Sequence, residues 1–236
     1  MNHPERIVPE RTERGIVAIH LKRYEFARRF CAGKDVLDAG CGVGYGSVHL
    51  ADVARRVVGV DVAADAIAYA REHFVKPNVE FVQADVLALP LERDSFDVAC
   101  SFETIEHVRN PEALVGELRR VLRAGGTCVL STPRVERTTR TPDNPFHVVE
   151  LSPDDFAALL RARFDNVELY GQRRLQTSRH RALQRVDVLG VRKHLAFLRP
   201  ASRLLGTPPM AEATLDDITI ERSAVDGATE VVAVCR

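Results

Sequence analysis

Short apolar runs along the chain alternate with segments in which apolar residues recur at helical spacing. Runs bounded by Gly, Asp and Pro are typical of buried strands, and helical spacing is typical of helices that cover a sheet. The predicted strands are KDVLD, RVVGVDV, VEFVQAD, FDVACS, TCVLSTP, DNVELYG and TEVVAVCR. The predicted helices span 15–30, 47–54, 65–74, 111–123 and 151–164. This order predicts an α/β sheet that is mostly parallel and covered by helices on both faces.

Two of the predicted helices carry clear end signals. Asn110 can cap the fourth helix, Pro111 suits its first turn, and the pair Gly125–Gly126 is expected to end it. Ser152 can cap the next helix, and Asp155 is expected to complete a capping box with it. These signals place the fifth strand between two helices.

The segment 172–206 departs from this pattern because it is strongly basic. It contains nine Lys and Arg residues against one acidic residue, Asp187, with leucines interleaved. The simpler interpretation is a solvated basic face on helices that pack beside the sheet. The alternative is a cap that meets an anionic substrate or makes a peripheral contact with a membrane.

These patterns divide the chain into four regions. We expect an N-terminal arm and lid helix over 1–30, a ligand-binding core over 31–171, a basic helical cap over 172–218, and the final strand or strands of the sheet over 219–236. The cap would then be an insertion within one domain, since the last strands return to the core.

Composition narrows the class of protein. Hydrophobic residues make up 45% of the 236 residues, which is typical of a globular protein with a full core. The 33 basic and 33 acidic residues balance, so no overall field favours nucleic acid or membranes. Five scattered cysteines without a CxxC pair indicate reduced core thiols. With no signal-peptide pattern and no apolar run near the roughly 20 residues of a membrane span, we expect a cytoplasmic protein.

Glycines stand at alternate positions in the turn after the first strand: Gly40, Gly42, Gly44 and Gly46. Glycines there let the backbone adopt positive φ and approach a ligand closely, with helix N–H groups exposed at the turn. A dinucleotide-binding turn of the form G-x-G-x-x-G would place its third glycine at position 45. That residue is Tyr45, which argues against a nicotinamide or flavin cofactor.

Carboxylates follow three successive strands: Asp38, Asp61 and Asp85. The carboxyl ends of parallel strands meet at one edge of a sheet, and ligands of open α/β sheets bind there. A carboxylate at Asp61 can accept both hydroxyls of a ribose. Asp85 could accept from the exocyclic amine of an adenine, with Val86 against the ring. Capping of local turns would explain one such aspartate better than it explains three.

Five motifs follow one another in a familiar order: VLDAGCGVGYGS, VVGVDVAADAIAYA, FVQADVLALP, SFDVACSFETIEHV and ELRRVLRAGGTCVLSTP. Together they resemble the motif set of class I S-adenosylmethionine-dependent methyltransferases, and in particular the small-molecule and ubiquinone-biosynthesis-like group. The resemblance implies a Rossmann-like class I methyltransferase fold. That fold has a seven-stranded, mostly parallel sheet with an antiparallel last strand and helices on both faces, here with a small helical cap insertion.

The resemblance also implies S-adenosylmethionine as the cofactor and a set of residues around it. The glycine turn would surround the methionine moiety, Asp61 would bind the ribose, and Ser101 and Phe102 would lie beside the reacting methyl. On the N-terminal helix, Tyr24 or Arg23 would touch the methionine carboxylate, or else form a core aromatic beside a solvated arginine. The residues expected at the cofactor are Tyr24, Asp38, Ala39, Gly40, Cys41, Gly42, Gly44, Gly46, Asp61, Val62, Asp85, Val86, Ser101 and Phe102.

The stretch SFETIEHV places Glu106 and His107 directly after the fourth strand, where an acceptor would meet the methyl group. Methyl transfer to a hydroxyl requires removal of a proton, and a histidine suits that role because its pKa lies near the operating pH. His147 lies in the loop after the fifth strand, which opens on the same edge of the sheet. We predict His107, His147 and Glu106 as catalytic residues.

Two other interpretations of this cluster remain. An E-x-x-E-H stretch followed by a loop histidine is similar to the small-RNA 3′-end 2′-O-methyltransferases. There the residues matching Glu103, Glu106, His107 and His147 hold a divalent metal, and carboxylates with imidazoles suit a Mg²⁺- or Mn²⁺-class ion. Alternatively, the two glutamates only favour the N-terminus of a helix through its dipole.

The sequence is least informative about the acceptor. The overall pattern resembles bacterial methyltransferases found with glycan and natural-product assembly. We therefore expect O-methylation of a sugar or another hydroxylated small molecule, and the basic segment 172–206 would suit an anionic or lipid-carried acceptor. Alternatives are a quinone-like phenol and an RNA ribose, the latter disfavoured by 6% aromatic residues and no Trp. A nicotinamide oxidoreductase and an inactive methyltransferase-like binding protein are the alternatives from other classes.

Overall fold

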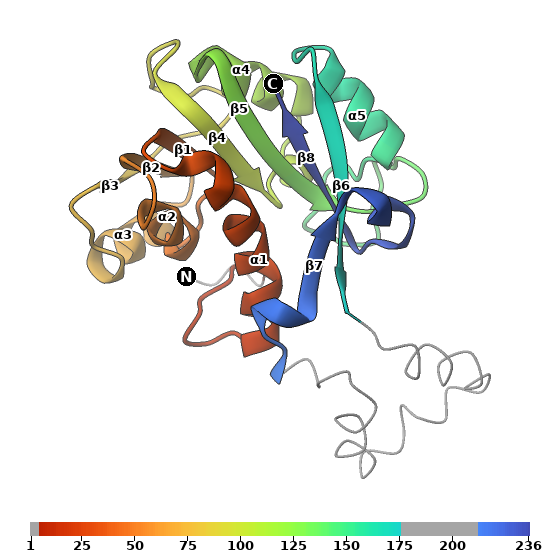
Figure 1. Ribbon diagram of the computed structural model, residues 1–236, viewed down its shortest axis with the longest axis horizontal. Coiled ribbons are helices and arrows are strands. Elements are labelled where there is room, and N and C mark those ends of the chain that lie inside the picture. Colours follow the sequence, from red (N-terminus) through yellow and green to blue (C-terminus); the bar gives the residue numbers. More distant parts are fainter. Residues whose placement is uncertain (1–4, 176–211) are drawn as a thin grey trace.

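The computed structural model describes residues 5–175 and 212–236, and its main feature is one sheet between two layers of helices (Figure 1). The predicted basic cap lies outside the described residues, apart from its first and last few. The strands are β1 Asp35–Ala39, β2 Arg56–Asp61, β3 Val79–Gln83, β4 Phe96–Phe102, β5 Leu122–Pro133, β6 Val167–Arg174, β7 Ile218–Glu221 and β8 Glu230–Cys235.

Five α-helices and three 3₁₀ turns connect the described strands. The α-helices are α1 Arg14–Cys31, α2 Tyr45–Ala51, α3 Ala64–His73, α4 Pro111–Val121 and α5 Pro153–Arg161. The 3₁₀ turns are η1 Ile105–His107, η5 Leu215–Asp217 and η6 Arg222–Gly227. Each of the five predicted helices is therefore present, with ends that differ by a few residues.

The strand order is β3-β2-β1-β4-β5-β8-β6-β7, with the first five strands parallel. β8 inserts between β5 and β6 and runs antiparallel to both, which confirms the predicted antiparallel last strand. The described sheet has eight strands rather than the seven expected, because β7 adds an antiparallel edge strand beside β6. Arg173 and Arg174, which begin the basic segment, belong to β6.

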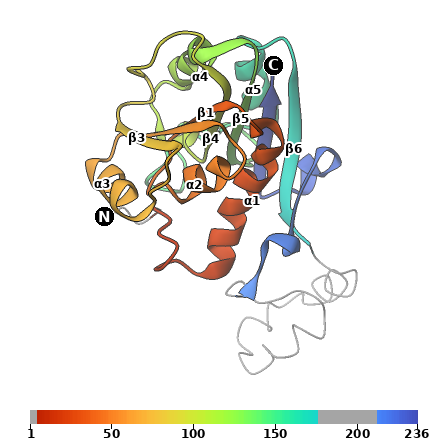
Figure 2. The ribbon, with the colours of Figure 1, turned by 60° about the vertical axis from the view of Figure 1, so that its left-hand side comes forward.

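Helices cover both faces of the sheet (Figure 2), and each face carries its own apolar core. Successive side chains of a strand point to opposite faces, so Val36 packs with α1 and α2 while Leu37 packs with α4 and α5. All five cysteines are buried without a disulfide, as predicted for core thiols. Among the described residues no helix has the length and apolar character to cross a bilayer.

The predicted caps Asn110 and Ser152 are confirmed, whereas the end of α4 and the capping box of α5 are corrected. Asn110 Oδ1 accepts a hydrogen bond from the Ala113 N–H at 3.0 Å, as expected for a cap. The helix ends at Val121, before the glycine pair, because the backbone is already extended at Leu122. Ser152 caps α5, but its own N–H donates to Thr138 Oγ1 at 2.9 Å. The predicted capping box is therefore wrong, since a distant threonine replaces the aspartate as the reciprocal partner.

The N-terminal arm before α1 runs along the edge where β2 and β5 end. Asn144, in the loop after β5, donates to Glu5 Oε1 at 2.6 Å. On α3, Asp65 accepts from Arg6 at 2.8 Å, and Tyr69 donates to a glutamate of the arm at 3.0 Å. These contacts hold the arm across the carboxyl ends of the strands, which is the ligand-binding edge of an open α/β sheet.

Candidate active site

The glycine turn between β1 and α2 has three glycines with left-handed φ angles, between +55° and +91°. A Cβ on Gly40 would lie 2.2 Å from Thr104 Oγ1, and one on Gly46 would lie 2.0 Å from the Tyr24 ring. A Cβ on Gly42 would meet nothing within 4 Å. Gly40 and Gly46 thus admit side chains of the protein itself, whereas Gly42 is the glycine of this turn that faces open space.

Asp38 is fully buried at the end of β1 and is held by two hydroxyls. Its carboxylate accepts from Ser47 Oγ at 2.6 Å and from the Tyr24 hydroxyl at 3.3 Å. Burial raises the pKa of Asp38 to about 7, and the nearby charge of Asp61 adds to the rise against the two hydrogen bonds. A cationic group bound at this turn would be stabilised by the ionised carboxylate.

Asp61 is fixed by the backbone at the end of β2. Its Oδ2 accepts from the Gly42 N–H and its Oδ1 from the Ala63 N–H, both at 2.9 Å. A carboxylate oxygen has two acceptor sites, so each oxygen can accept one more donor. The next side chain, Val62, is apolar and 67% exposed. A carboxylate with spare acceptor sites beside an exposed apolar side chain suits a ribose with its attached base.

The two residues expected near the adenine, Asp85 and Val86, differ in their exposure to solvent. Asp85 is exposed, and its Oδ1 accepts from the Leu87 N–H at 2.9 Å. Val86 is only 7% exposed and belongs to the core on the α4 side. The side chains of Ala39 and Cys41 are also buried, so these two residues could reach a cofactor only through their backbone.

Arg23 lies fully buried on α1, which excludes the alternative of a solvated arginine. One of its terminal nitrogens donates to His20 Nδ1 at 2.9 Å. The other donates to Gln172 Oε1 at 3.5 Å and lies 4.0 Å from the Glu230 carboxylate. Burial, together with the charge of Arg23, holds the pKa of His20 well below its usual value, so that imidazole is neutral. The Nε of Arg23 has no hydrogen-bond partner among the described residues. A buried guanidinium paired this loosely favours an anion nearby.

The end of β4 brings Phe102 against α1. The Phe102 ring packs edge-to-face on Tyr24, with ring centroids 4.9 Å apart. Ser101 is 2% exposed, and its Oγ has no hydrogen-bond partner within the described ranges. An unpaired buried hydroxyl is costly and calls for a polar partner.

Glu103 and Glu106 are bound by hydroxyls of β5 rather than by the histidines. Ser131 Oγ donates to Glu103 Oε1 at 2.7 Å, and Thr132 Oγ1 donates to Glu106 Oε2 at 3.2 Å. Burial, and next the charge of Glu103, raise the pKa of Glu106 well above its usual value. Glu106 is 1% exposed. The structure therefore does not bring these carboxylates into one cluster with the imidazoles, and the Glu106 carboxylate is bound by β5 instead.

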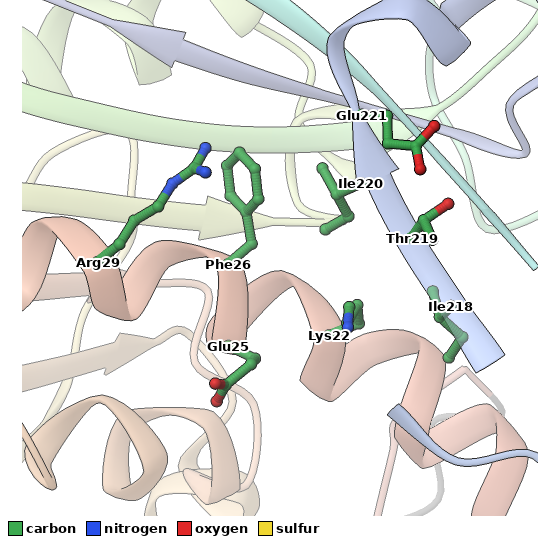
Figure 3. Close-up of a pocket in the computed structure, with 8 residues that line it drawn as sticks. All are labelled: Lys22, Glu25, Phe26, Arg29, Ile218, Thr219, Ile220 and Glu221. Atoms are coloured by element: carbon green, nitrogen blue, oxygen red, sulfur yellow. The ribbon is translucent and has the colours of Figure 1, made fainter. Parts of the chain in front are cut away.

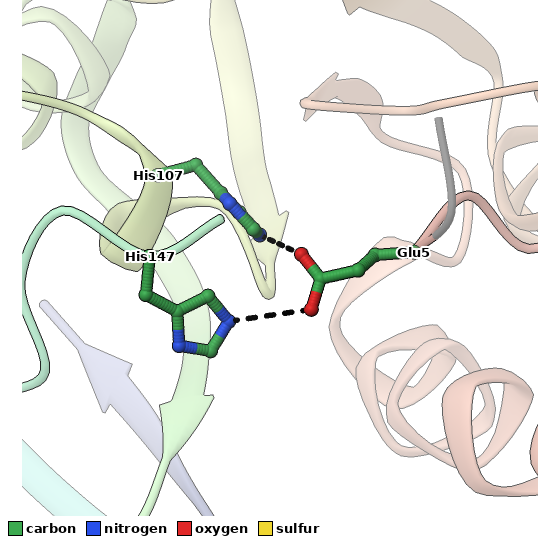
Figure 4. A group of neighbouring side chains, drawn as sticks. All are labelled: Glu5, His107 and His147. Atoms are coloured by element: carbon green, nitrogen blue, oxygen red, sulfur yellow. Dashed lines mark ion pairs between the residues drawn. The ribbon is translucent and has the colours of Figure 1, made fainter. Parts of the chain in front are cut away.

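His107 and His147 meet at the mouth of the site, as the sequence predicted. Their ring centroids lie 4.9 Å apart in an edge-to-face arrangement. The carboxylate that joins them is Glu5 of the N-terminal arm, 3.9 Å from His107 Nε2 and 3.8 Å from His147 Nε2 (Figure 4). Glu5 could not be predicted as a site residue from the sequence, because an isolated glutamate in a polar arm carries no local signal of a site.

A shallow groove of about 370 Å³ lies at a different place, between α1 and the edge strand β7 (Figure 3). Its lining combines Lys22, Glu25, Phe26 and Arg29 of α1 with residues 218–221. In the strand order it lies at the opposite end from β2 and β3. It therefore does not belong to the site around the glycine turn.

Comparisons with known proteins agree with this geometry. Residues 37–130 match the family model described as a methyltransferase domain. A probable S-adenosylmethionine-dependent methyltransferase of Mycobacterium tuberculosis is 40% identical over 174 residues, which cover 67% of this chain and 62% of that protein. A phosphoethanolamine N-methyltransferase of Triticum aestivum is 34% identical over 146 residues, covering 59% of this chain and 26% of that protein.

A solved structure shares the fold. The crystal structure of an S-adenosylmethionine-dependent methyltransferase from Thermotoga maritima, described as a possible histamine N-methyltransferase, aligns with a TM-score of 0.63. The alignment covers 94% of this chain and 93% of that chain at 16% identity. From the domain match, the mycobacterial relative and this shared fold, we conclude that the chain belongs to the class I S-adenosylmethionine-dependent methyltransferases.

Proposed function

We propose that this protein transfers a methyl group from S-adenosylmethionine to a hydroxyl of a small-molecule acceptor. The observation that carries the proposal is the meeting of His107 and His147 beside the glycine turn. Thr104 packs against Gly40 of that turn, and His107 follows only three residues later. A cofactor held by the turn and an acceptor held by the histidines would therefore share one mouth.

The residues of the turn fit the cofactor in three respects. Gly42 leaves open space next to the fixed carboxylate of Asp61, which suits the ribose hydroxyls. The exposed Val62 suits one face of the adenine. Arg23 Nε and Ser101 Oγ are buried polar atoms without partners in the described ranges, and they suit the carboxylate and polar atoms of the methionine moiety. When bound, the cofactor supplies an electrophilic methyl group on a sulfonium.

His107 is suited to remove the proton of the acceptor. Its Nδ1 lies 3.0 Å from the carbonyl oxygen of Phe146, which can only accept, so Nδ1 carries the proton. The lone pair of the neutral ring is then on Nε2, which lies toward Glu5 and His147. His107 Nε2 would accept the hydroxyl proton as the acceptor oxygen bonds to the methyl carbon that the bound cofactor would supply. The electron pair of the broken carbon–sulfur bond would stay with the cofactor.

We infer that the acceptor is a sugar or another hydroxylated small molecule, because a histidine base is needed for a hydroxyl. An amine acceptor is the second candidate, since the wheat relative is named as a phosphoethanolamine N-methyltransferase. A neutral amine can attack first and lose its proton afterwards, so it requires less help from a base. Replacement of His107 should therefore affect the two acceptor classes differently.

Calorimetry with S-adenosylmethionine, S-adenosylhomocysteine and NADH tests the cofactor. We expect both sulfur compounds to bind and NADH not to bind; tight binding of NADH alone would overturn the proposal. A screen of nucleotide sugars, glycolipid precursors, phenols and phosphorylated amines, read out by the mass of one added methylene unit, then identifies the acceptor. Binding of the cofactor without turnover on any of these would favour an inactive binding protein.

A further inference from the structure

We propose that Glu5, His107 and His147 form a binding site for a zinc-class divalent cation, built by the N-terminal arm at the mouth of the active site. The ligand atoms of the three side chains all lie within 4.8 Å of one another. This set differs from the one expected from the sequence, since it takes its carboxylate from the arm rather than from Glu103 or Glu106.

The hydrogen bonds of both imidazoles match those of metal ligands. Ligating histidines donate their other ring N–H to a carbonyl or carboxylate, which fixes the tautomer and the ring orientation. His107 Nδ1 lies 3.0 Å from the Phe146 carbonyl oxygen, and His147 Nδ1 lies 2.6 Å from Glu150 Oε1. Both rings are thus held by Nδ1, and both Nε2 atoms lie toward the same carboxylate (Figure 4).

Asn144 supports the tautomer of His147 independently. Its Oδ1 accepts from the Phe146 N–H at 3.0 Å, which identifies the other amide atom as nitrogen. That Nδ2 lies 3.0 Å from His147 Nε2 and 2.6 Å from Glu5 Oε1. Because an amide nitrogen only donates, His147 Nε2 carries a lone pair. A cation would displace this amide and take both acceptors.

Glu5 contributes the charge that two imidazoles lack. Its Oε2 is buried and has no hydrogen-bond partner among the described residues, although a carboxylate oxygen prefers several. The distances of 3.8 and 3.9 Å between its oxygens and the Nε2 atoms are slightly wider than a tetrahedral site requires. Zinc bonds of about 2.0–2.2 Å set neighbouring ligand atoms roughly 3.4 Å apart. The three side chains therefore have to move closer together around the cation, since their ligand atoms lie within 4.8 Å of one another.

The ligand types favour a particular class of cation. Two imidazoles and one carboxylate suit Zn²⁺ or Co²⁺ better than Mg²⁺, which prefers oxygen ligands. Three protein ligands leave a fourth position open at the mouth of the site. Resting on the proposed function, occupancy would inhibit methyl transfer, because the cation would take the His107 Nε2 lone pair that accepts the proton.

The test is a titration of the full chain, stripped with EDTA, with ZnCl₂ by calorimetry and with CoCl₂ by visible absorption. We expect one site with a tetrahedral cobalt spectrum, and at least about tenfold weaker binding in Glu5→Gln. Glu10→Gln is the matched control, since Glu10 lies on the same arm but binds Tyr69. It also reports background binding by histidines elsewhere in the chain. His147→Ala should lose the site as well.

Three results would overturn the inference: no zinc or cobalt binding by the wild-type chain, equal binding by Glu5→Gln and Glu10→Gln, or faster turnover of the zinc-loaded enzyme than of the stripped enzyme.

Trypsin cleavage after Arg6 and Arg11 gives a second readout. A cation that ties Glu5 to the loops should slow this cleavage in wild type but not in Glu5→Gln. Cofactor binding by the stripped chain is measured in parallel. Its loss would contradict the proposed function, whereas the cation site would still be judged by the titrations.

Discussion

The cofactor side and the acceptor side of this site are built in different ways. The centre of the cofactor side comes from one continuous stretch, β1 to β2, where Asp61 binds the backbone of Gly42 and Ser47 binds Asp38, and a few side chains join it from α1 and β4. The acceptor side consists of three side chains from distant segments, Glu5, His107 and His147. Local backbone geometry therefore determines the first half, whereas the second half depends on the arm and two loops being in place. Substitutions should therefore separate the two halves.

His107→Ala should damage the acceptor side alone. General-base catalysis contributes about 10²–10⁴-fold, so kcat on a hydroxyl acceptor should fall by that amount while cofactor affinity stays within about twofold. Steady-state kinetics and calorimetry on the same preparations measure both. His73→Ala, on α3 and stacked on Tyr69, serves as the control. An unchanged kcat would show that His107 is not the base.

Asp38→Asn should change the pH dependence of stability on the cofactor side. The folded pKa of about 7 exceeds the usual value of 3.8, so between these pH values the native state binds more protons than the unfolded state. Wild-type stability then falls as pH rises through this range, and the cost is complete above about pH 7. The variant lacks this titration. Between about pH 4 and pH 7, its free energy of unfolding should therefore rise relative to that of wild type by up to about 4 kcal/mol.

Urea unfolding of both proteins at several pH values between 4 and 8 measures that change. Asparagine has one acceptor oxygen fewer than aspartate, which lowers the stability of the variant by an amount independent of pH. Only the change with pH of the difference in unfolding free energy is therefore informative. A difference that does not vary with pH would mean that Asp38 titrates normally in the folded protein.

Asp61→Ala should weaken cofactor binding about 100-fold and leave the acceptor side unchanged. Hydrogen bonds to a charged group contribute about 1.5–3 kcal/mol, and the variant also frees the Gly42 and Ala63 N–H groups. Calorimetry with S-adenosylhomocysteine gives the affinity. Glu80→Gln is the matched control, because Glu80 lies on β3 and pairs with Arg56. Equal affinities of Asp61→Ala and wild type would remove Asp61 from the ribose assignment.

Gly46→Ala should lower stability by about 1–3 kcal/mol through overpacking, because its Cβ would lie 2.0 Å from the buried Tyr24 ring. Gly116→Ala is the opposite case. Gly116 lies inside α4 with nothing within 4 Å of an added Cβ, so the variant should gain about 0.5–1 kcal/mol. Thermal unfolding measures the stability of both variants, one with a side chain added at a tight contact and one with a side chain added in open space. A stable Gly46→Ala protein would mean that α1 can shift away from the turn.

The positions of the aspartates and glycines around the turn could be predicted from the sequence because their signals are local. The aspartates at the ends of β1 and β2 and the glycines between them lie within one strand–helix–strand stretch. Neighbouring residues there determine one another's positions, and the strand ends are fixed by parallel pairing. The sequence could not predict which glycines make room for side chains of the protein, because Thr104 and Tyr24 contact the turn from other parts of the chain.

The acceptor side was predicted in part. The loops after β4 and β5 open at one edge, which was enough to bring His107 and His147 together. The same reasoning grouped Glu106 with the histidines, and its contact with Thr132 could not be predicted because it depends on how the loop packs. Glu5 carried no periodic or motif signal. The sequence left open whether Arg23 is solvated, as most arginines are, and its burial reflects the position of α1 on the sheet.

The backbone at Glu103 has a consequence for how this protein tolerates substitution. Its φ angle of +47° lies in the left-handed region, which costs a residue with a side chain roughly 1–2 kcal/mol. Glycine would remove that cost at this position, yet it would also release Ser131. Glu103→Gly should therefore be a variant that gains backbone stability and loses order where β4 meets the acceptor side. The strained backbone at Glu103 is thus coupled to the hydrogen bond that ties the end of β4 to β5, so relieving one loosens the other.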